Sequence, residues 1–196
     1  MSLYESQSYL DQYLLFHYGN SLEIDSFQIF PESFLNFAER TVTENLDASN
    51  ERERALDLGC SVGRSCFELS RFCDEVIGID YSNQFIRAAE KIRVEGSIKF
   101  NSLQEGDQFR SHNAIMPEGS RPERISFHTG DALQLPDDIG RFDIIHAANL
   151  LCRLSDPEHL LKKLPELLNE GGSLVITTPC TWLGEFTPME NWPEGS

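Results

Sequence analysis

The sequence predicts an α/β fold built on a doubly wound, mostly parallel sheet. Five short apolar, β-branched runs recur along the chain, and helix-like segments separate the first run from the second and the fourth from the fifth. Continuous apolar runs are typical of strands that are buried on both faces. Alternation of strands with helices favours parallel pairing through right-handed crossovers, so we expect a single sheet with crossover helices packed against it.

The expected strands are the five apolar runs themselves. They are ALDLG from Ala55, EVIGID from Glu75, ISFHTGD from Ile125, FDIIHAAN from Phe142 and SLVITTP from Ser173. After the last run only CTWLGEFTPMENWPEGS remains, whereas doubly wound sheets often continue further. We therefore expect either a reduced sheet that lacks the usual last strands or a piece of a longer domain.

Four helices are expected in the first half of the chain. Ser82 is a good N-cap for a helix over residues 82–94, and a shorter helix is expected over residues 64–72. Ahead of the first strand, residues 8–19 form one helical candidate and a second opens at Pro31, where proline favours the first helical position. We expect these two N-terminal helices to lie over the carboxyl edge of the sheet or along its face.

The second half of the chain is expected to hold one helix. It starts near Asp156 with Ser155 as its N-cap, is kinked at Pro165 and ends at the glycine pair 171–172. The segment 95–124 carries several glycines and prolines with little periodicity, so it is interpreted as a loop or insertion. In outline, we expect a helical cap over residues 1–50 and a core over residues 51–196, within one domain.

Composition excludes several classes of function. The 196 residues carry 16 Lys and Arg against 32 Asp and Glu, a formal charge of −16, so nucleic acid is not expected as a partner. No apolar stretch is long enough to span a membrane. The five cysteines include no CxxC pair and the first residues do not resemble a secretion signal, which favours reduced thiols in the cytoplasm. The histidines show no metal-ligand spacing, so no metal is expected.

A glycine turn follows the first expected strand and indicates a nucleoside ligand. Gly59 and Gly63 allow close approach of the backbone, and Asp80 ends the second strand, where a carboxylate can accept hydrogen bonds from ribose hydroxyls. Asp57 precedes the turn and suits an ammonium group better than a pyrophosphate. Asp131, after the third strand, is placed to take an adenine amino group. A ligand with ribose, an α-amino group and no phosphate is S-adenosylmethionine.

These motifs together resemble class I S-adenosylmethionine-dependent methyltransferases. ALDLGCSVG is similar to their first motif, GIDYS to the ribose-binding motif and GDALQLP to the adenine-binding motif, over residues 55–179. The resemblance implies a Rossmann-like methyltransferase sheet. It also implies the following cofactor contacts: Asp57, Gly59, Cys60, Gly63, Asp80, Tyr81, Asp131, Ala132 and Asn149.

The flanking segments resemble a narrower group. YLLFHYG, LDLGCSVGRSCFELSR, AANLLCRL and LVITTPCTWLGEFTPMENW are together similar to the C-terminal methyltransferase domain of ovothiol-biosynthesis proteins. That resemblance implies methyl transfer to an imidazole nitrogen of 4-mercaptohistidine. The iron-dependent sulfoxide synthase half of those proteins is absent from this chain, so a functional partner that carries it is expected.

Acceptor-site residues are suggested by family position and by charge. His17 and Tyr18 are the nearest candidates for a base, although His17 is equally well interpreted as a surface or capping residue. Arg64 or Arg153 is expected to bind the carboxylate of an amino-acid acceptor, unless both are solvated arginines at helix ends. Two aromatic residues complete the predicted substrate site: Tyr13 and Trp182, with Phe186 as a further cover.

Two alternatives stay open at this point. The chain could bind the cofactor without turnover, as a regulatory or truncated module. It could also be a nicotinamide oxidoreductase, which the spacing DLGCSVG disfavours because dinucleotide turns read GxGxxG. Methyl transfer itself asks the protein mainly for alignment and exclusion of water, so neither a metal nor a covalent nucleophile is required.

Overall fold

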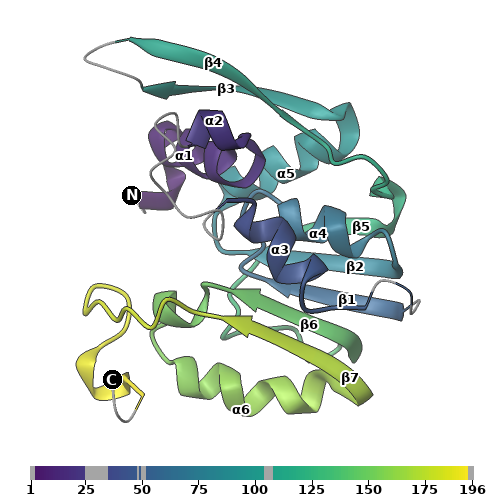
Figure 1. Cartoon of the computed structure of the whole chain (residues 1–196). Coiled ribbons are helices and arrows are strands. Elements are labelled where there is room, and N and C mark those ends of the chain that lie inside the picture. Colours follow the sequence, from purple (N-terminus) through teal and green to yellow (C-terminus); the bar gives the residue numbers. More distant parts are fainter. Residues whose placement is uncertain (1–2, 25–34, 48, 50–51, 104–107, 194–196) are drawn as a thin grey trace.

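A computed structural model describes residues 3–24, 35–47, 49, 52–103 and 108–193 of the chain. Its centre is a five-stranded sheet in the order β5-β2-β1-β6-β7, and every neighbouring pair is parallel (Figure 1). The strands are β1 (Arg52–Leu58), β2 (Cys73–Asp80), β5 (Ile125–Thr129), β6 (Phe142–Ala148) and β7 (Leu168–Thr177). The chain builds outward from β1 to β5 and then returns to β6 on the other side of β1. The predicted doubly wound sheet is therefore confirmed.

Helices cover both faces of this sheet (Figure 1). The α-helices are α1 (Gln7–Tyr18), α2 (Ser21–Ile24), α3 (Phe37–Thr43), α4 (Arg64–Leu69), α5 (Asn83–Glu95) and α6 (Pro157–Leu167). Short 3-10 turns are η1 (Leu3–Glu5), η3 (Pro122–Arg124), η4 (Leu151–Arg153) and η5 (Met189–Asn191). Side chains of α4 and α5 pack on one face, and those of α6 pack on the other.

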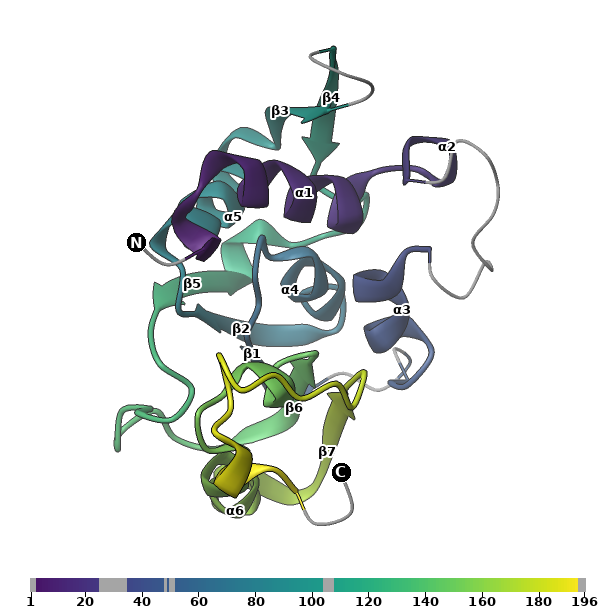
Figure 2. The same cartoon turned by 90° about the vertical axis from the view of Figure 1, so that its left-hand side faces the viewer.

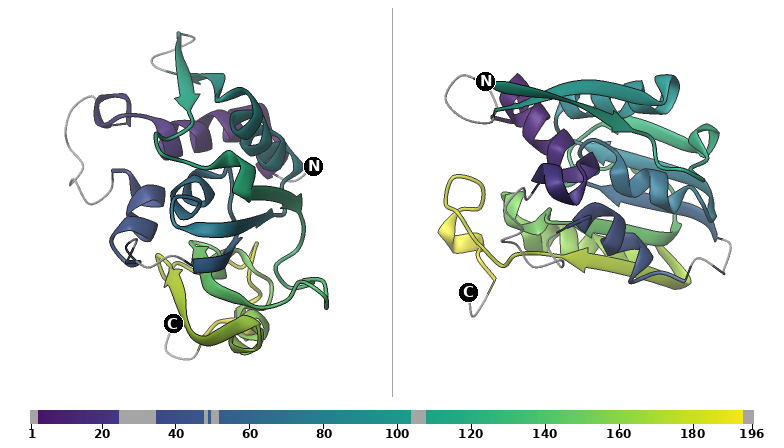
Figure 3. Two further views of the ribbon diagram at one scale, coloured as in Figure 1. Left: turned by 90° about the vertical axis from the view of Figure 1, so that its right-hand side faces the viewer. Right: turned by 45° about the horizontal axis from the view of Figure 1, so that its top comes forward.

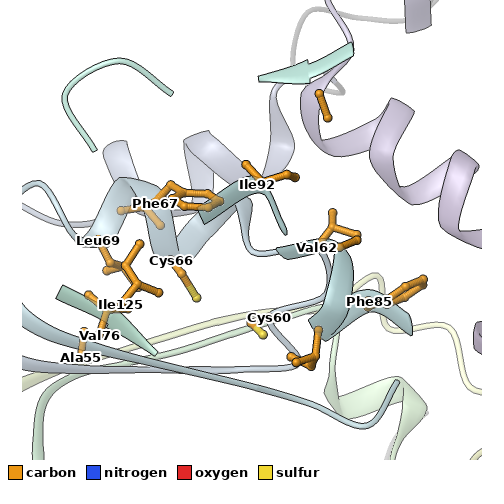
Figure 4. Close-up of a cluster of buried hydrophobic side chains, with 14 of the residues drawn as sticks. Ala55, Cys60, Val62, Cys66, Phe67, Leu69, Val76, Phe85, Ile92 and Ile125 are labelled. Carbon is orange, nitrogen blue, oxygen red and sulfur yellow. The ribbon is translucent and has the colours of Figure 1, made fainter. Parts of the chain in front are cut away.

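Alternation along β1 divides the buried side chains into two cores. Ala55 belongs to the cluster under α4 and α5, whereas Leu56 belongs to the cluster above α6. Because successive side chains of a strand point to opposite faces, a single apolar run supplies both cores. Figure 4 shows the first cluster, with Phe67 and Cys66 of α4 close to Ala55 and Val76 of the sheet.

The N-terminal helices share the first of these cores. Leu14 of α1 and Val42 of α3 are fully buried within it. α1 begins one residue before the expected range, with Ser6 as its N-cap. The expected start at Pro31 lies outside the described residues, and α3 begins at Phe37 after a turn.

The predicted boundaries of α5 are confirmed, whereas both limits of α6 and the end of α4 differ from the prediction. Helix α5 begins after Ser82, whose Oγ accepts a hydrogen bond from the Phe85 amide, and ends near its predicted limit. Helix α6 is capped by Asp156 and not by Ser155, because the Asp156 carboxylate accepts from the His159 amide at 2.9 Å. α6 also ends two residues after Pro165, so the glycine pair 171–172 lies inside β7 instead. Helix α4 ends at Leu69, three residues before its predicted limit.

The segment predicted as a loop contains an antiparallel hairpin, β3 (Ser97–Leu103) with β4 (Phe109–Ile115). It packs on α1 and α5 and extends away from the main sheet (Figure 3). The inward face alternates Phe100 and Ser102 on one strand with His112 and Ala114 on the other. Half of these buried positions are polar, so the period-two pattern was hidden in the sequence.

The carboxyl edge of the sheet is flanked by segments from both ends of the chain. Figure 2 looks onto this edge, with α1 across the upper part and the segment after β7 across the lower part. The second segment is fixed by the Thr187 hydroxyl, which donates to the Leu154 carbonyl at 2.7 Å, and by the Asn191 amide, which donates to the Ser155 carbonyl. The space between the two segments is where the strand order reverses, which is the usual position of a ligand in such sheets.

Candidate active site

A cavity of about 630 Å³ occupies the carboxyl edge at this point. Its floor is formed by the residues that end β1, β2, β5 and β6, and α1 and the segment after β7 form its walls. Eleven of the predicted site residues line it: Tyr13, His17, Asp57, Gly59, Cys60, Asp80, Tyr81, Asp131, Ala132, Asn149 and Arg153. A volume of this size is typical of sites for small molecules.

The glycine turn after β1 is shaped by two different requirements. Gly59 has φ of +71°, and a Cβ there would lie 3.1 Å from Leu150 Cδ1. Gly63 has φ of +83°, and a Cβ there would lie 2.7 Å from Phe127 Cζ. Gly59 lines the cavity, as predicted, but Gly63 does not. The position of Gly63 instead lets α4 start close against β5.

Asp57 is held beneath the turn by a buried network. Its side chain is 2% exposed, and Oδ1 accepts a hydrogen bond from His146 Nδ1 at 2.7 Å. Oδ2 accepts from the Cys66 thiol at 3.1 Å, and His146 Nε2 lies 2.9 Å from Thr41 Oγ1. Because an ionised carboxylate can only accept, His146 carries its proton on Nδ1. Both oxygens of Asp57 therefore have protein partners already, while the side chain still lines the cavity.

Cys60 contributes to the turn through its backbone, whose amide donates to the Ile79 carbonyl at 3.1 Å. The Gly59 amide donates to the same carbonyl at 2.8 Å. Burial raises the pKa of the Cys60 thiol to about 11. The sulfur is thus a protonated group in the cavity wall.

Asp80 ends β2 and turns its carboxylate toward the glycine turn. Oδ2 accepts from the Ser61 amide at 2.9 Å, and Oδ1 accepts from the Ser82 amide at 2.8 Å. Burial raises the pKa of this carboxyl to about 6, although the two amides oppose that rise. These two backbone donors fix the orientation of the carboxylate, and they therefore also fix the directions in which its remaining lone pairs can accept hydrogen bonds.

The other predicted cofactor residues lie around the opening. Asp131 accepts from the Leu133 amide at 2.9 Å through Oδ1, and Ala132 next to it is buried. Tyr81 is 71% exposed and stands at the rim. Asn149 has φ of +55°, and its amide donates to the Thr177 carbonyl at 2.8 Å. Asp131, which follows β5, and Asn149, which follows β6, thus both line the same cavity.

Helix α1 brings Tyr13 and His17 to the cavity, one turn apart. Their rings stack with centroids 5.9 Å apart, and Tyr13 also packs on Phe85 at 4.6 Å. His17 Nδ1 is buried and has no hydrogen-bond partner in the part of the chain that the structure describes. Burial lowers the pKa of His17 to about 4, which the Asp57 charge opposes. The imidazole is therefore neutral near pH 7.

Tyr18 is not placed to act as a base. It does not line the cavity, and its hydroxyl donates to the Val62 carbonyl at 2.8 Å. Burial raises the pKa of the phenol well above its usual value. Tyr18 instead joins α1 to the glycine turn.

The two candidate arginines differ in their environment. Arg64 lies outside the cavity and forms ion pairs with Glu39, at 2.8 Å, and with Glu68. Arg153 lines the cavity, and its guanidinium carbon lies 4.7 Å from the centroid of the Phe186 ring. Arg153 is thus the candidate arginine that the structure brings to the cavity, and Arg64 is not.

Of Trp182 and Phe186, which were expected to cover the pocket, only Phe186 lines the cavity. Trp182 packs against the second core. His146 was not predicted as a site residue, yet it lines the cavity and its Nδ1 lies 2.7 Å from Asp57 Oδ1. The available signal was a histidine within the apolar run FDIIHAAN, since buried polar side chains need a partner.

Within the described ranges, no group of three or more His, Cys, Asp or Glu side chains is arranged to hold a metal ion. None of the helices in those ranges combines the length and the apolar character needed to cross a membrane.

S-adenosylmethionine fits the donors and acceptors of this cavity. Asp80 offers a fixed carboxylate at the end of β2 for ribose hydroxyls, and Asp57 offers negative charge beneath the turn for an ammonium group. The arginine nearest the turn, Arg64, is paired with Glu39 and Glu68, and the Asp57 carboxylate lies beneath the turn, which disfavours a pyrophosphate at this position. The donor set thus suits a nucleoside without phosphate.

Comparison with known proteins also shows similarity between this chain and methyltransferases. Residues 32–194 match a family model described as a methyltransferase domain. The chain is 25% identical over 131 residues to norajmaline N-methyltransferase of Rauvolfia serpentina, an overlap that covers 66% of this chain and 37% of that protein. It is 26% identical over 162 residues to methyltransferase GfsG of Streptomyces halstedii, which covers 82% of this chain and 49% of that protein. The chain therefore spans half or less of the length of these relatives.

A solved structure from Listeria monocytogenes, described as an S-adenosylmethionine dependent methyltransferase, has the same fold. It aligns with a TM-score of 0.51 and 15% identity over 72% of this chain and 55% of that chain. The family match extends from before α3 to the segment after β7, so it includes the strand-end floor of the cavity but not its α1 wall. It implies S-adenosylmethionine as the cofactor. This chain belongs to the methyltransferase domain family.

Proposed function

We propose that this chain transfers the methyl group of S-adenosylmethionine to a small molecule, and that the acceptor atom is an imidazole nitrogen of 4-mercaptohistidine. The observation that carries the general proposal is one cavity that joins the strand-end carboxylates to an aromatic wall on α1. The narrower acceptor is supported by the sequence resemblance of YLLFHYG and TWLGEFTPMENW to the ovothiol group. Both segments contribute residues to the cavity, namely Tyr13, His17 and Phe186.

When bound, the cofactor supplies a methyl group on a positively charged sulfur, which is already a strong electrophile. In the proposed reaction the acceptor nitrogen forms a bond to the methyl carbon as the carbon–sulfur bond breaks, and the electron pair of that bond stays on sulfur. The protein has to align the two ligands and exclude water. A cavity enclosed by α1 and by the segment after β7 provides both.

His17 has a defined part in this proposal. Its buried Nδ1 has no hydrogen-bond partner in the described chain, which favours a ligand group that forms a hydrogen bond with it. A pKa of about 4 makes the ring a weak base, so we assign it the orientation of the acceptor and not full removal of a proton. Replacing His17 with Phe should lower kcat by at least about tenfold, because orientation is lost while the ring volume is kept.

The proposal is tested in two steps. Calorimetry with S-adenosylhomocysteine measures cofactor binding; incubation with S-adenosylmethionine and 4-mercapto-L-histidine, followed by mass spectrometry, measures transfer. We expect binding and a product heavier by one methylene. His159→Phe, on the exposed face of α6, is the matched control for His17→Phe and should transfer at the normal rate. A folded full-length protein that binds no S-adenosylhomocysteine would overturn the whole proposal.

Two other outcomes separate the alternatives. Transfer to other small molecules but not to mercaptohistidine would retain methyl transfer and reject the narrower acceptor. Binding without transfer to any acceptor would favour a cofactor-binding module, an alternative supported by the chain spanning 37% to 49% of the two relatives. We further propose that the sulfur-inserting step is carried out by a separate partner protein, which co-expression with a sulfoxide synthase would test.

A further inference from the structure

The cavity holds one strongly basic side chain. Among the described residues that line it, Arg153 is the one Lys or Arg, whereas four carboxylates face the same space: Asp57, Asp80, Asp131 and Glu185. The chain as a whole carries a formal charge of −16. Such surroundings repel an anionic ligand everywhere except near a cation, so the position of Arg153 decides where an anionic group can be bound.

The guanidinium of Arg153 has unused donors. Nη1 donates to the Cys152 carbonyl at 3.1 Å and lies 3.5 Å from the Cys152 sulfur, and the planar group lies over the Phe186 ring. In the ranges that the structure describes, Nε and Nη2 have no hydrogen-bond partner and no carboxylate lies within 4.0 Å of the group. These two nitrogens form the edge that binds a carboxylate through two parallel hydrogen bonds.

Other arginines of the chain form ion pairs with glutamate side chains. Arg64 is paired with Glu39 and Glu68, and Arg93 is paired with Glu90. Arg153 instead lines the cavity and has no carboxylate partner among the described residues. A guanidinium that lacks a protein carboxylate is a favourable position for a ligand carboxylate.

Aromatic side chains surround this position. Tyr4 packs edge-on against Tyr13 and Phe85, and lies 6.3 Å from Phe186 between ring centroids. Arg153 is close enough to Tyr13 for its charge to oppose the rise in the phenol pKa that burial causes. The cavity thus places aromatic side chains and a carboxylate-binding edge near one another.

We infer that Arg153 binds the carboxylate of the methyl acceptor, and that the acceptors of this site are small aromatic or heteroaromatic acids. The inference rests on the proposed methyl transfer and gives its small-molecule acceptor a chemical class. The cofactor also carries a carboxylate, but Arg153 lies in η4 after β6, over the Phe186 ring and near Tyr13 of α1. Tyr13 stacks on His17, to which the orientation of the acceptor was assigned above, and the experiment below distinguishes the acceptor carboxylate from that of the cofactor.

The test compares ligands and variants in the full chain with S-adenosylhomocysteine bound. Binding of 4-mercapto-L-histidine and of its decarboxylated analogue is measured by calorimetry with the wild type and with Arg153→Met and Arg153→Lys. We expect the wild type to prefer the acid by about tenfold or more, as a bidentate charged pair implies. Arg153→Met should remove the preference and Arg153→Lys should keep part of it. The control is Arg87→Met, an exposed position on α5, which should behave as the wild type.

Each outcome bears on the inference. A wild type without any preference for the acid overturns it, and this comparison needs no variant to fold. A preference that survives Arg153→Met overturns it as well. Loss of S-adenosylhomocysteine affinity in folded Arg153→Met, with the acid preference intact, would assign Arg153 to the cofactor. Failure of the wild type to bind S-adenosylhomocysteine would overturn the proposed function itself, which is a distinct result.

Discussion

His146 and Asp57 stand directly opposite one another in the register of β6 and β1, and a 2.7 Å hydrogen bond joins their side chains. Both are nearly inaccessible to solvent, at 1% and 2%. Asp57 lies between two such contacts, with the Cys66 thiol on the other oxygen. The carboxylate beneath the cofactor site is therefore oriented by its neighbours before any ligand arrives.

Replacing His146 with Leu should destabilise the protein and weaken cofactor binding. The change leaves Asp57 buried with one partner fewer, which costs about 3 kcal/mol of unfolding free energy. Urea unfolding and calorimetry with S-adenosylhomocysteine measure the two effects. His159→Leu on the exposed face of α6 is the control and should stay within about 0.5 kcal/mol. Wild-type behaviour of His146→Leu in both assays would contradict the role of the network.

Cofactor affinity should fall as the pH drops through about 6. Ribose hydroxyls donate to the ionised form of Asp80, whose pKa is raised to about 6. S-adenosylhomocysteine affinity measured from pH 7.5 to pH 5 should therefore decrease, and Asp80→Asn should give a weak but flat profile. A wild-type profile as flat as that of the variant would speak against the assignment.

The same pKa gives stability the opposite dependence. A carboxyl whose folded pKa lies above its unfolded value binds more protons in the folded state, so its contribution is largest at low pH and is lost as the pH rises from about 4 to about 6. Urea unfolding of the ligand-free protein measures the unfolding free energy at pH 4.5 and at pH 7. The decrease from pH 4.5 to pH 7 should be smaller in Asp80→Asn than in the wild type.

Tyr18→Phe should retain methyl transfer. The hydroxyl binds the Val62 carbonyl and does not face the cavity, so its removal costs about 1 kcal/mol of stability and no proton-transfer step. Steady-state kinetics and thermal unfolding test this together. A complete loss of activity in a variant that still binds S-adenosylhomocysteine would restore Tyr18 as a catalytic candidate.

Gly63→Ala should destabilise the protein more than Gly96→Ala. Both glycines have positive φ, +83° and +79°, so both variants are strained by the backbone. Only at Gly63 would the new Cβ meet a neighbour, Phe127 at 2.7 Å, which adds an overpacking cost of about 1–3 kcal/mol. Urea unfolding of the two variants measures this difference in unfolding free energy. Equal decreases in Gly63→Ala and Gly96→Ala would show that α4 can shift away from β5.

Sequence patterns predicted the sheet well because its strands are buried on both faces and read as apolar runs. The strand-end carboxylates Asp80 and Asp131 followed from the same logic, since parallel strands bring their carboxyl ends to one edge. The hairpin was missed because Ser102 and His112 occupy half of its buried face, where they bond to each other at 2.7 Å. A polar pair inside a two-stranded ribbon leaves no apolar alternation to detect.

The two arginines could not be separated from sequence for a related reason. The partner that removes Arg64 from the site, Glu39, lies 25 residues earlier on another helix. Whether Trp182 or Phe186 reaches the cavity depends on the path of the chain after β7. Contacts of Thr187 and Asn191 with the loop after η4 hold that segment in place. Such choices depend on tertiary contacts between segments that carry no shared local pattern.

The burial of the thiols has a further consequence for the proposed mercaptohistidine acceptor. Thiol–disulfide exchange requires a thiolate, and Cys60 in the cavity wall keeps its proton with a pKa of about 11. Cys66 and Cys73 are held in the same state, and Cys180 is the exposed thiol of the chain. A disulfide form of a mercaptoimidazole would thus meet no nucleophile at Cys60, and mixed disulfides or maleimide labels should form at Cys180.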